Sequence, residues 1–168
     1  MYLLLSFTCC MPPTGHTQTL VAQESSLQAA LLFNFAVYTE WPALGADSIE
    51  FCVMGSQPVW EALSHLQHKK IKGRALELKA ITSPAQAASC QVLFVGAAEQ
   101  KKIHTINQLL PTAPLLLVAE EGDVDLKDVV IALRKQDGRY TFKINQTAAQ
   151  ARSLNFSSRL LKLATLVY

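Results

Sequence analysis

The first 68 of the 168 residues contain no lysine or arginine, and five acidic residues give this part of the chain a formal charge of −5. All 15 basic residues lie in residues 69–168 together with the other eight acids, which gives +7. The basic residues are scattered over several elements and are not interleaved with aromatic ones, so nucleic-acid binding has little support. The uneven distribution can still steer an acidic partner towards the chain.

Sequence motifs of catalysis are absent too. The chain has no G-x-x-x-x-G-K-S/T or G-x-G-x-x-G loop, no G-x-S-x-G elbow and no C-x-x-C pair. The predicted strands end without a carboxylate, unlike those of a phosphate-accepting receiver domain, and the acids of residues 120–123 are better interpreted as solvated loop residues. We therefore expect a protein that is not an enzyme and has no cofactor.

Two histidines are the only metal candidates. His65 and His68 are three residues apart near the end of a predicted helix, which is a spacing that can bind a metal. Lys69 and Lys70 follow directly and disfavour a bound cation, and no third ligand is evident. We expect no metal site.

The chain has no apolar run long enough to cross a bilayer. Residues 3–11 form a short apolar stretch that is typical of a signal-peptide core, although the usual basic residues before it are missing. Either the true start codon lies upstream of residue 1, or these residues are an ordinary disordered N-terminus. We expect residues 1–22 to be a signal peptide or disordered leader, with cleavage after Ala22, and residues 23–168 to be one soluble periplasmic domain.

Predicted strands and helices alternate along most of the chain. The helices are expected at 24–38 (with Ser25 or Ser26 as N-cap), 58–66, 84–89 and 98–110, and the strands at 49–54, 75–81, 91–95 and 115–118. Residues 69–74 are expected to be a polar loop. This rhythm predicts an α/β fold, a single domain with a mostly parallel twisted sheet and helices on both faces.

The C-terminal part follows another pattern. Residues 129–133 and 139–144 flank Asp137-Gly138, which predicts a β-hairpin. A short helix at 146–151 and a last helix at 157–167 follow. The last helix has a stripe of apolar residues that we expect to pack on the sheet, namely Leu160, Leu161, Ala164 and Val167.

Cys52 and Cys90 are the only cysteines outside the N-terminal stretch, and each lies in or beside a predicted central strand. One pair in the folded part suggests a structural disulfide, which would place the protein in an oxidising compartment. Two buried free thiols are nearly as consistent with the composition.

Two stretches of the chain carry motifs of a known family. Residues 28–42 read Gln-Ala-Ala-Leu-Leu-Phe-Asn-Phe-Ala-Val-Tyr-Thr-Glu-Trp-Pro, which is similar to the N-terminal helix motif of the YfiR-like family of periplasmic proteins. A second set of residues is similar to the C-terminal motif of the same family: Tyr140 to Asn145, Ala148-Ala149, Leu154 and Ser157 to Ala164. Segments around Cys52, Gly73 and Cys90 lie between them in the family's order. The resemblance covers about residues 24–167.

The resemblance implies a secreted α/β domain with a Cys52–Cys90 disulfide. It also implies a regulator that binds the periplasmic sensor domain of an inner-membrane diguanylate cyclase, represses cyclic di-GMP synthesis and thereby controls biofilm growth. Family members form homodimers and hold a second disulfide in the C-terminal half, for which this chain has no cysteine. The alternative is a small-molecule sensor acting with a histidine kinase or transporter, which would bind an effector in the loops at 55–57, 96–97 and 119–120.

The motif residues themselves are interpreted mainly as structural: Asn34, Phe35, Glu40, Trp41, Pro42, Gly73, Asn145, Ser157, Ser158 and Leu161. Asn34 is expected to satisfy a buried backbone group, and Glu40-Trp41-Pro42 to fix the turn between helix and sheet. Asn145 suits an N-cap or an Asx-turn. The partner-binding surface is not identified by the motifs.

Overall fold

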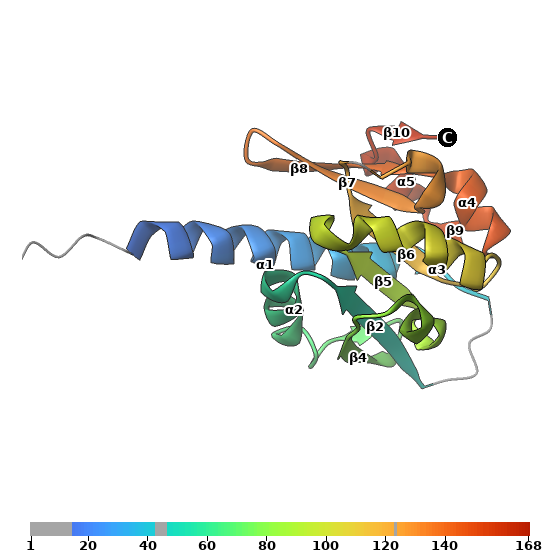
Figure 1. The fold of residues 1–168 in the computed structure, drawn as a ribbon, viewed down its shortest axis with the longest axis horizontal. Coiled ribbons are helices and arrows are strands. Elements are labelled where there is room, and N and C mark those ends of the chain that lie inside the picture. Colours follow the sequence, from blue (N-terminus) through green and yellow to red (C-terminus); the bar gives the residue numbers. More distant parts are fainter. Residues whose placement is uncertain (1–14, 43–46, 123) are drawn as a thin grey trace, which may run out of the picture.

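The computed structural model of the protein describes residues 15–42, 47–122 and 124–168. An eight-stranded sheet in the order β10-β8-β7-β6-β5-β2-β4-β3 forms its centre (Figure 1). Its strands are β2 (Ser48–Met54), β3 (Lys70–Ile71), β4 (Arg74–Ala80), β5 (Val92–Val95), β6 (Leu116–Glu120), β7 (Ile131–Gln136), β8 (Arg139–Ile144) and β10 (Leu166–Val167). The five strands from β7 to β4 are mutually parallel, β3 and β8 run antiparallel to their neighbours, and β10 is parallel to β8.

Helices cover both faces of this sheet, as predicted. They are α1 (Gly15–Tyr38), α2 (Gln57–Ser64), α3 (Ile103–Leu109), α4 (Gln146–Ala151) and α5 (Ser158–Leu163), with 3-10 helices η1 (Pro84–Ser89), η2 (Ala97–Lys102) and η3 (Leu126–Asp128). Figure 1 shows α1 behind the sheet and α3 in front of it. A second, two-stranded sheet pairs β1 (Thr39–Glu40) with β9 (Asn155–Phe156).

The core lies in the central parallel strands. All four residues of β5 are fully buried, and so are residues 116–119 of β6. A strand that is covered on both faces requires a continuous apolar run, which is the pattern these two segments have in the sequence. Phe35 of α1 adds an edge-to-face contact with Phe142 of β8, with ring centroids 4.8 Å apart.

The first helix begins earlier than predicted. Helix α1 starts at Gly15, so Ser25 and Ser26 lie inside it and are not N-caps. Both hydroxyls donate to the carbonyl of Ala22, at 3.1 and 2.7 Å. Serine side chains that bond back to the preceding turn are compatible with a helix interior. No helix among the described residues has both the length and the apolar character to cross a bilayer.

Two short strands lie where other structure was predicted: β3 within the predicted loop at 69–74, and β10 within the predicted last helix. Lys70–Ile71 forms β3 because Lys72 and Gly73 adopt positive φ angles of 50° and 83°, which close a two-residue hairpin onto β4 and bury Ile71. The last helix was predicted to reach Val167 but ends at Leu163. Thr165 then donates its amide and hydroxyl hydrogens to the carbonyl of Phe142, at 2.9 and 3.0 Å, so the chain pairs with β8.

The shorter α5 changes which leucine anchors it. Leu160 is 2% exposed, whereas Leu161 is only half-buried and Val167 is exposed. We expect Leu160→Ala to lower the free energy of unfolding by about 2–5 kcal/mol, as truncations of buried leucines do, and Leu161→Ala to cost less. Urea unfolding of the two variants side by side measures the difference, and an equal or larger loss for Leu161→Ala would contradict this packing.

Candidate functional site

The two motif stretches meet in space although 97 residues, 43–139, separate them in the chain. β1 follows directly after α1 and pairs antiparallel with β9, with Thr39 opposite Phe156 and Glu40 opposite Asn155. The amide of Ser157 donates to the carbonyl of Tyr38 at 3.0 Å. This junction ties the first helix to the C-terminal part, which is a structural role for the residues around it.

Several motif residues have visible structural roles. Asn145 is the N-cap of α4: its side chain accepts from the amide of Ala148 at 2.8 Å and is 5% exposed. Ser157 is the N-cap of α5 and accepts from the amide of Leu160, and Ser158 is the first residue of that helix. Trp41 packs against the core beside an exposed Pro42.

Asn34 does not behave as expected. Its side chain is exposed on α1, so the expectation that it satisfies a buried backbone group is wrong. The error arose because Asn34 lies between apolar residues in the sequence, while the helical turn places it on the solvent side. Phe35, the next residue, points into the core and is 1% exposed.

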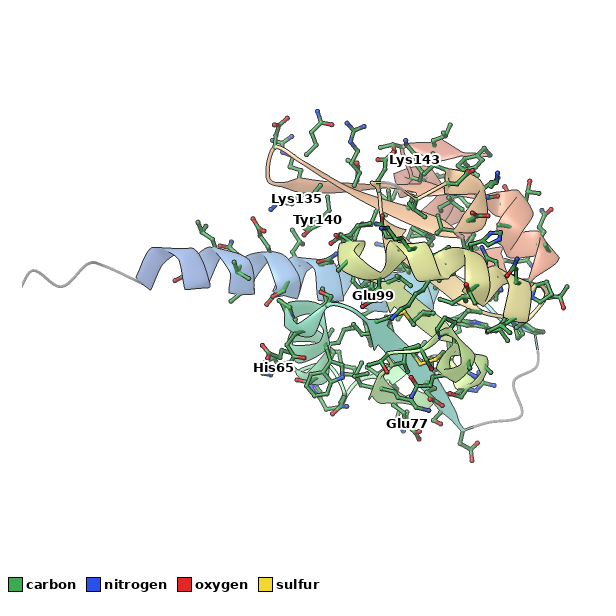
Figure 2. All side chains as sticks on the ribbon, viewed as in Figure 1. His65, Glu77, Glu99, Lys135, Tyr140 and Lys143 are labelled. Carbon is green, nitrogen blue, oxygen red and sulfur yellow. A yellow bond between two sulfur atoms is a disulfide. The ribbon has the colours of Figure 1, made fainter. Side chains whose placement is uncertain are left out.

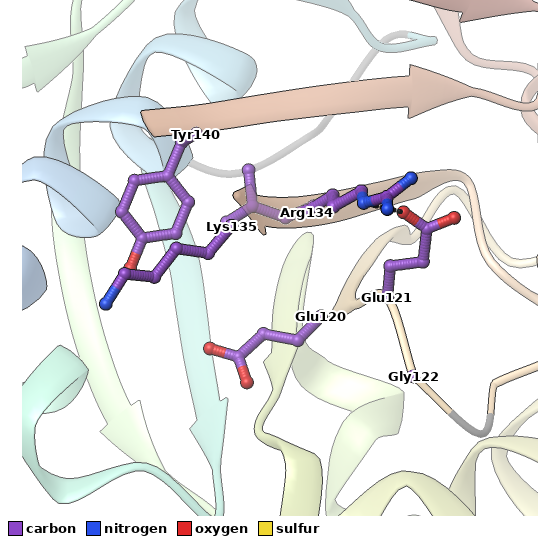
Figure 3. Close-up of a pocket in the computed structure, with 7 residues that line it drawn as sticks. Glu120, Glu121, Gly122, Arg134, Lys135 and Tyr140 are labelled. Carbon is purple, nitrogen blue, oxygen red and sulfur yellow. Dashed lines mark ion pairs between the residues drawn. The ribbon is translucent and has the colours of Figure 1, made fainter. Parts of the chain in front are cut away.

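A polar pocket of about 470 Å³ lies at the carboxyl edge of the sheet, where ligands of parallel α/β folds bind. Its lining residues come from the end of β6 and from the β7–β8 hairpin: Glu120, Glu121, Gly122, Leu133, Arg134, Lys135 and Tyr140. The hairpin tip and the first half of α1 both extend beyond the sheet at this edge (Figure 1). Lys135 and Tyr140 lie on the part of the hairpin that faces α1 (Figures 2 and 3).

Ion pairs and hydrogen bonds link α1 to this edge. Lys135 Nζ contacts Glu24 Oε1 at 2.5 Å, and Gln28 Nε2 donates to Glu120 Oε1 at 2.7 Å. The hydrogen bond with Glu24 raises the pKa of Lys135, so this side chain stays cationic. Burial raises the pKa of Tyr140, whose hydroxyl therefore stays protonated.

On the other face of the hairpin, Glu121 is the central charge. Its Oε1 contacts Lys143 Nζ at 2.5 Å, and its Oε2 is 3.7 Å from Arg134 Nε (Figure 3). Glu121 Oε2 is buried and has no hydrogen-bond partner within the described residues. The pocket thus offers charges of both signs, which suits a small ligand or a side chain with both polar donors and acceptors.

The three loops proposed for effector binding do not form one site. Residues 119–120 reach the pocket described above, but Gly55, Ser56 and Gln57 line a separate hollow of about 400 Å³ beside Trp60. Gly96 lies against Gly55, where a Cβ atom on residue 96 would come within 2.6 Å of the Gly55 carbonyl oxygen. The close packing of these two glycines leaves no room for a ligand between them.

The contacts that α1 makes with this edge were missed in the sequence. Gln28 and Glu24 belong to α1, and their partners lie about 90 to 110 residues further along the chain. The predicted hairpin around Asp137-Gly138 was the available signal, because it places Lys135 and Tyr140 opposite each other on one face.

Cys52 and Cys90 form a disulfide with Cα atoms 5.9 Å apart. Cys52 lies in β2, and Cys90 is the C-cap of η1, two residues before β5, which is the parallel neighbour of β2. Both are buried, at 0% and 6% exposure. The sequence left a disulfide and two free thiols open, and the pairing implied by the resemblance is confirmed.

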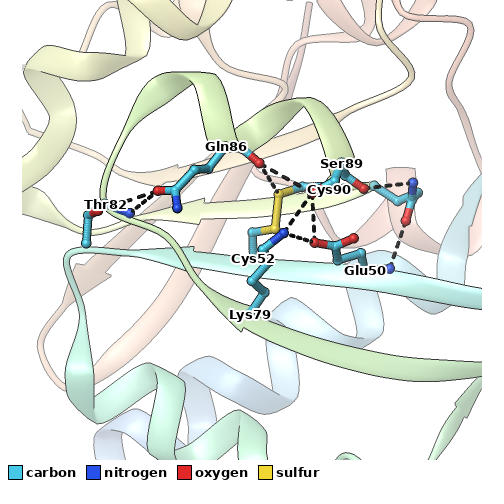
Figure 4. A network of polar contacts seen from close by, with 8 residues as sticks. Glu50, Cys52, Lys79, Thr82, Gln86, Ser89 and Cys90 are labelled. Carbon is cyan, nitrogen blue, oxygen red and sulfur yellow. Dashed lines mark hydrogen bonds and ion pairs between the residues drawn. A yellow bond between two sulfur atoms is a disulfide. The ribbon is translucent and has the colours of Figure 1, made fainter.

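A polar network surrounds this disulfide (Figure 4). Glu50 Oε1 accepts from Lys79 Nζ at 2.9 Å and from Ser89 Oγ at 2.8 Å. Burial raises the pKa of Glu50, but the hydrogen bonds and the charge of Lys79 outweigh it, so the pKa lies below its ordinary value. These contacts link β2, β4 and the end of η1 next to Cys90.

In the described part of the chain, side chains of the types that can bind a metal come together at one place. Ligand atoms of Glu50, Cys52 and Cys90 lie within 4.8 Å of one another. Both sulfur atoms are bonded to each other, and Lys79 is paired with the carboxylate, so these atoms are committed to other bonds. His65 and His68 are exposed at the end of α2 and are not part of this group.

Comparison with known proteins identifies a family and a similar solved structure. The sequence model of the YfiR/HmsC-like family matches residues 25–165, which include both motif stretches. Among solved structures, the ABC domain from Streptococcus pneumonia, crystallised in complex with L-Trp, superposes with a TM-score of 0.55 at 11% sequence identity. The match covers 86% of this chain and 60% of that chain. At this identity the likeness concerns the fold alone.

Proposed function

The chain belongs to the YfiR/HmsC-like family, and from this premise we propose that it binds the periplasmic sensor domain of an inner-membrane diguanylate cyclase and represses cyclic di-GMP synthesis. The family consists of periplasmic regulators of such cyclases. The family match over residues 25–165 is the observation that carries the proposal. Repression by binding requires a partner surface and no catalytic group.

Two features of the molecule support this function. A disulfide between two buried strand positions fits an oxidising compartment such as the periplasm. The motif residues at the β1–β9 junction are engaged in the fold, which leaves the exposed surfaces of the sheet edges and helices to partner binding.

Export is a separate part of the proposal. Residues 1–22 are proposed to be removed as a leader, with the mature domain beginning near Gln23. Residues 1–14 lie outside the described part of the chain, and α1 is continuous across Ala22. Fractionation should recover a shortened chain from the periplasm, and a full-length chain in the cytoplasm would contradict the proposal.

The binding function is tested with residues 23–168 as bait for detergent-solubilised membranes. We expect capture of a diguanylate cyclase that has a periplasmic domain. Deletion of the gene should then raise cellular cyclic di-GMP, and expression of the wild-type chain should lower it again. Unchanged cyclic di-GMP in the deletion strain would contradict repression.

The polar pocket at the carboxyl edge favours a second function. A volume of about 470 Å³ is enough for a small molecule, and Arg134, Lys135, Tyr140 and Glu120 supply donors and acceptors. Such an effector would control a histidine kinase or a transporter, or adjust repression of the cyclase. A gene for one of these proteins beside that of this chain would favour the alternative.

A further inference from the structure

The two edges of the eight-stranded sheet differ in how they are protected. At one edge, β3 carries exposed Lys70, with Lys69 and Lys72 on either side of the strand. Lysines at a sheet edge prevent pairing with other chains. At the opposite edge, β10 consists of Leu166 and Val167, and both are exposed. Charged side chains therefore protect the β3 edge against pairing with another strand, whereas the two residues of β10 carry no charge.

The main chain of β10 has groups directed to the open edge. Val167 lies opposite Ile144 of β8, and the amide of Tyr168 donates to the carbonyl of Ile144 at 3.1 Å. In a parallel ladder the amide and carbonyl of alternate residues point to the same neighbouring strand. The N–H and C=O groups of Val167 therefore point away from β8. Figure 1 shows β10 at the outer margin of the molecule.

Apolar side chains gather at the same place. Leu163, Leu166, Val167 and Tyr168 are 64%, 47%, 37% and 40% exposed. Leu166 and Val167 are consecutive strand residues and point to opposite faces of the sheet, and the Tyr168 hydroxyl donates to the carbonyl of Leu126 at 2.9 Å. The edge thus combines exposed apolar side chains on both faces with the outward main-chain groups of Val167. An exposed apolar strand of this kind is a template for the addition of another strand.

The charges on the helix that precedes β10 indicate the kind of strand that fits. Helix α5, which leads into β10, carries Arg159 and Lys162 and has no acidic residue. Arg159 lies 5.7 Å from the centre of the Tyr38 ring, and neither cation forms an ion pair with any described residue. A strand with a carboxylate near the α5 end would complement both cations.

We propose that β10 is the docking edge for an extended, apolar segment of the cyclase's periplasmic domain that carries an acidic residue beside its apolar ones. The segment joins the sheet next to β10, and Val167 supplies the main-chain hydrogen bonds. Its apolar side chains cover Leu163 and Leu166, and its carboxylate contacts Arg159 and Lys162. This inference rests on the proposed function, since that function supplies the partner.

The test uses Val167→Pro, which removes the free N–H without breaking a hydrogen bond to β8, and Val167→Lys, which gives this edge the charge that β3 has. Leu109→Lys is the matched control, because Leu109 is an apolar residue at 54% exposure on α3, away from either edge. Each variant is first checked for an unchanged thermal unfolding midpoint. Binding to the periplasmic domain of the captured cyclase is then measured by calorimetry.

We expect Val167→Pro to bind about tenfold more weakly, as the loss of one or two main-chain hydrogen bonds would give. Val167→Lys should also bind more weakly, because a charged side chain then replaces an apolar contact at the edge. The Leu109→Lys variant should bind like the wild type, and Arg159→Gln with Lys162→Gln should weaken binding mainly at low salt. If the wild type binds and the Val167 variants bind equally well, the edge is not the docking site while the proposed function stands. If the Val167 variants only change a dimer into a monomer, β10 pairs with a second copy and the inference is wrong. If the wild type itself does not bind, the proposed function and the inference are both wrong.

Discussion

Replacement of Cys52 by alanine is expected to lower the free energy of unfolding by about 4 kcal/mol, which is the chain-entropy estimate for a bridge between positions 38 residues apart. The disulfide joins two neighbouring parallel strands at the centre of the sheet. Its loss would allow the unfolded chain many more conformations while leaving the sheet hydrogen bonds in place. A change of this size is a large share of the stability of a single domain.

The measurement is urea unfolding of Cys52→Ala and of the double variant Cys52→Ala/Cys90→Ala, each with and without a dithiol reductant. The reductant should destabilise the wild type by a similar amount and leave the double variant unchanged. Since both sulfurs are buried, the effect of the reductant should develop slowly, at the rate at which η1 opens. A wild type whose stability is the same with complete reduction would contradict the expected contribution of the disulfide.

The same variant separates a structural role of the disulfide from a regulatory one. If redox state controls repression, Cys52→Ala should raise cyclic di-GMP as deletion of the gene does. The periplasmic level of the variant is measured in parallel, because loss of the protein alone gives the same signal. A variant that accumulates normally and still represses would show that the disulfide serves stability only.

The central sheet was predictable because its strands have strong local signals. β5 and β6 are continuous apolar runs between breaks, and Asp137-Gly138 adopts the positive φ angles that a two-residue hairpin needs. These features depend on residues that are near one another in the sequence.

The missed features depend on distant partners. A strand of two residues, such as β3 or β10, has too few positions to show a period, and it forms only because a neighbouring strand offers an open edge. The contacts between α1 and the carboxyl edge depend on α1 residues whose ion pair and hydrogen bond are with β7 and β6. Phe35 of α1 is buried, but the apolar neighbours of Asn34 concealed that its side chain points to solvent.

Phe35 and Asn34 provide the sharpest test of the motif as a structural device. Phe35 is 1% exposed and contacts the ring of Phe142, so it joins α1 to the C-terminal hairpin. We expect Phe35→Ala to lower the free energy of unfolding by about 3–5 kcal/mol, the range for buried phenylalanines. Asn34→Ala should leave stability unchanged or raise it slightly, because alanine is the better helix former and the asparagine side chain is exposed.

Urea unfolding gives the two free energies, and cyclic di-GMP in a deletion strain complemented with each variant gives the effect on repression. If the motif serves the fold, Phe35→Ala loses repression in proportion to its folded fraction, and Asn34→Ala represses like the wild type. A stable Asn34→Ala variant that fails to repress would contradict this assignment, because an exposed side chain that is dispensable for folding and required for repression must contact the partner. The exposed face of α1 would then be the binding surface, in place of the edge at β10.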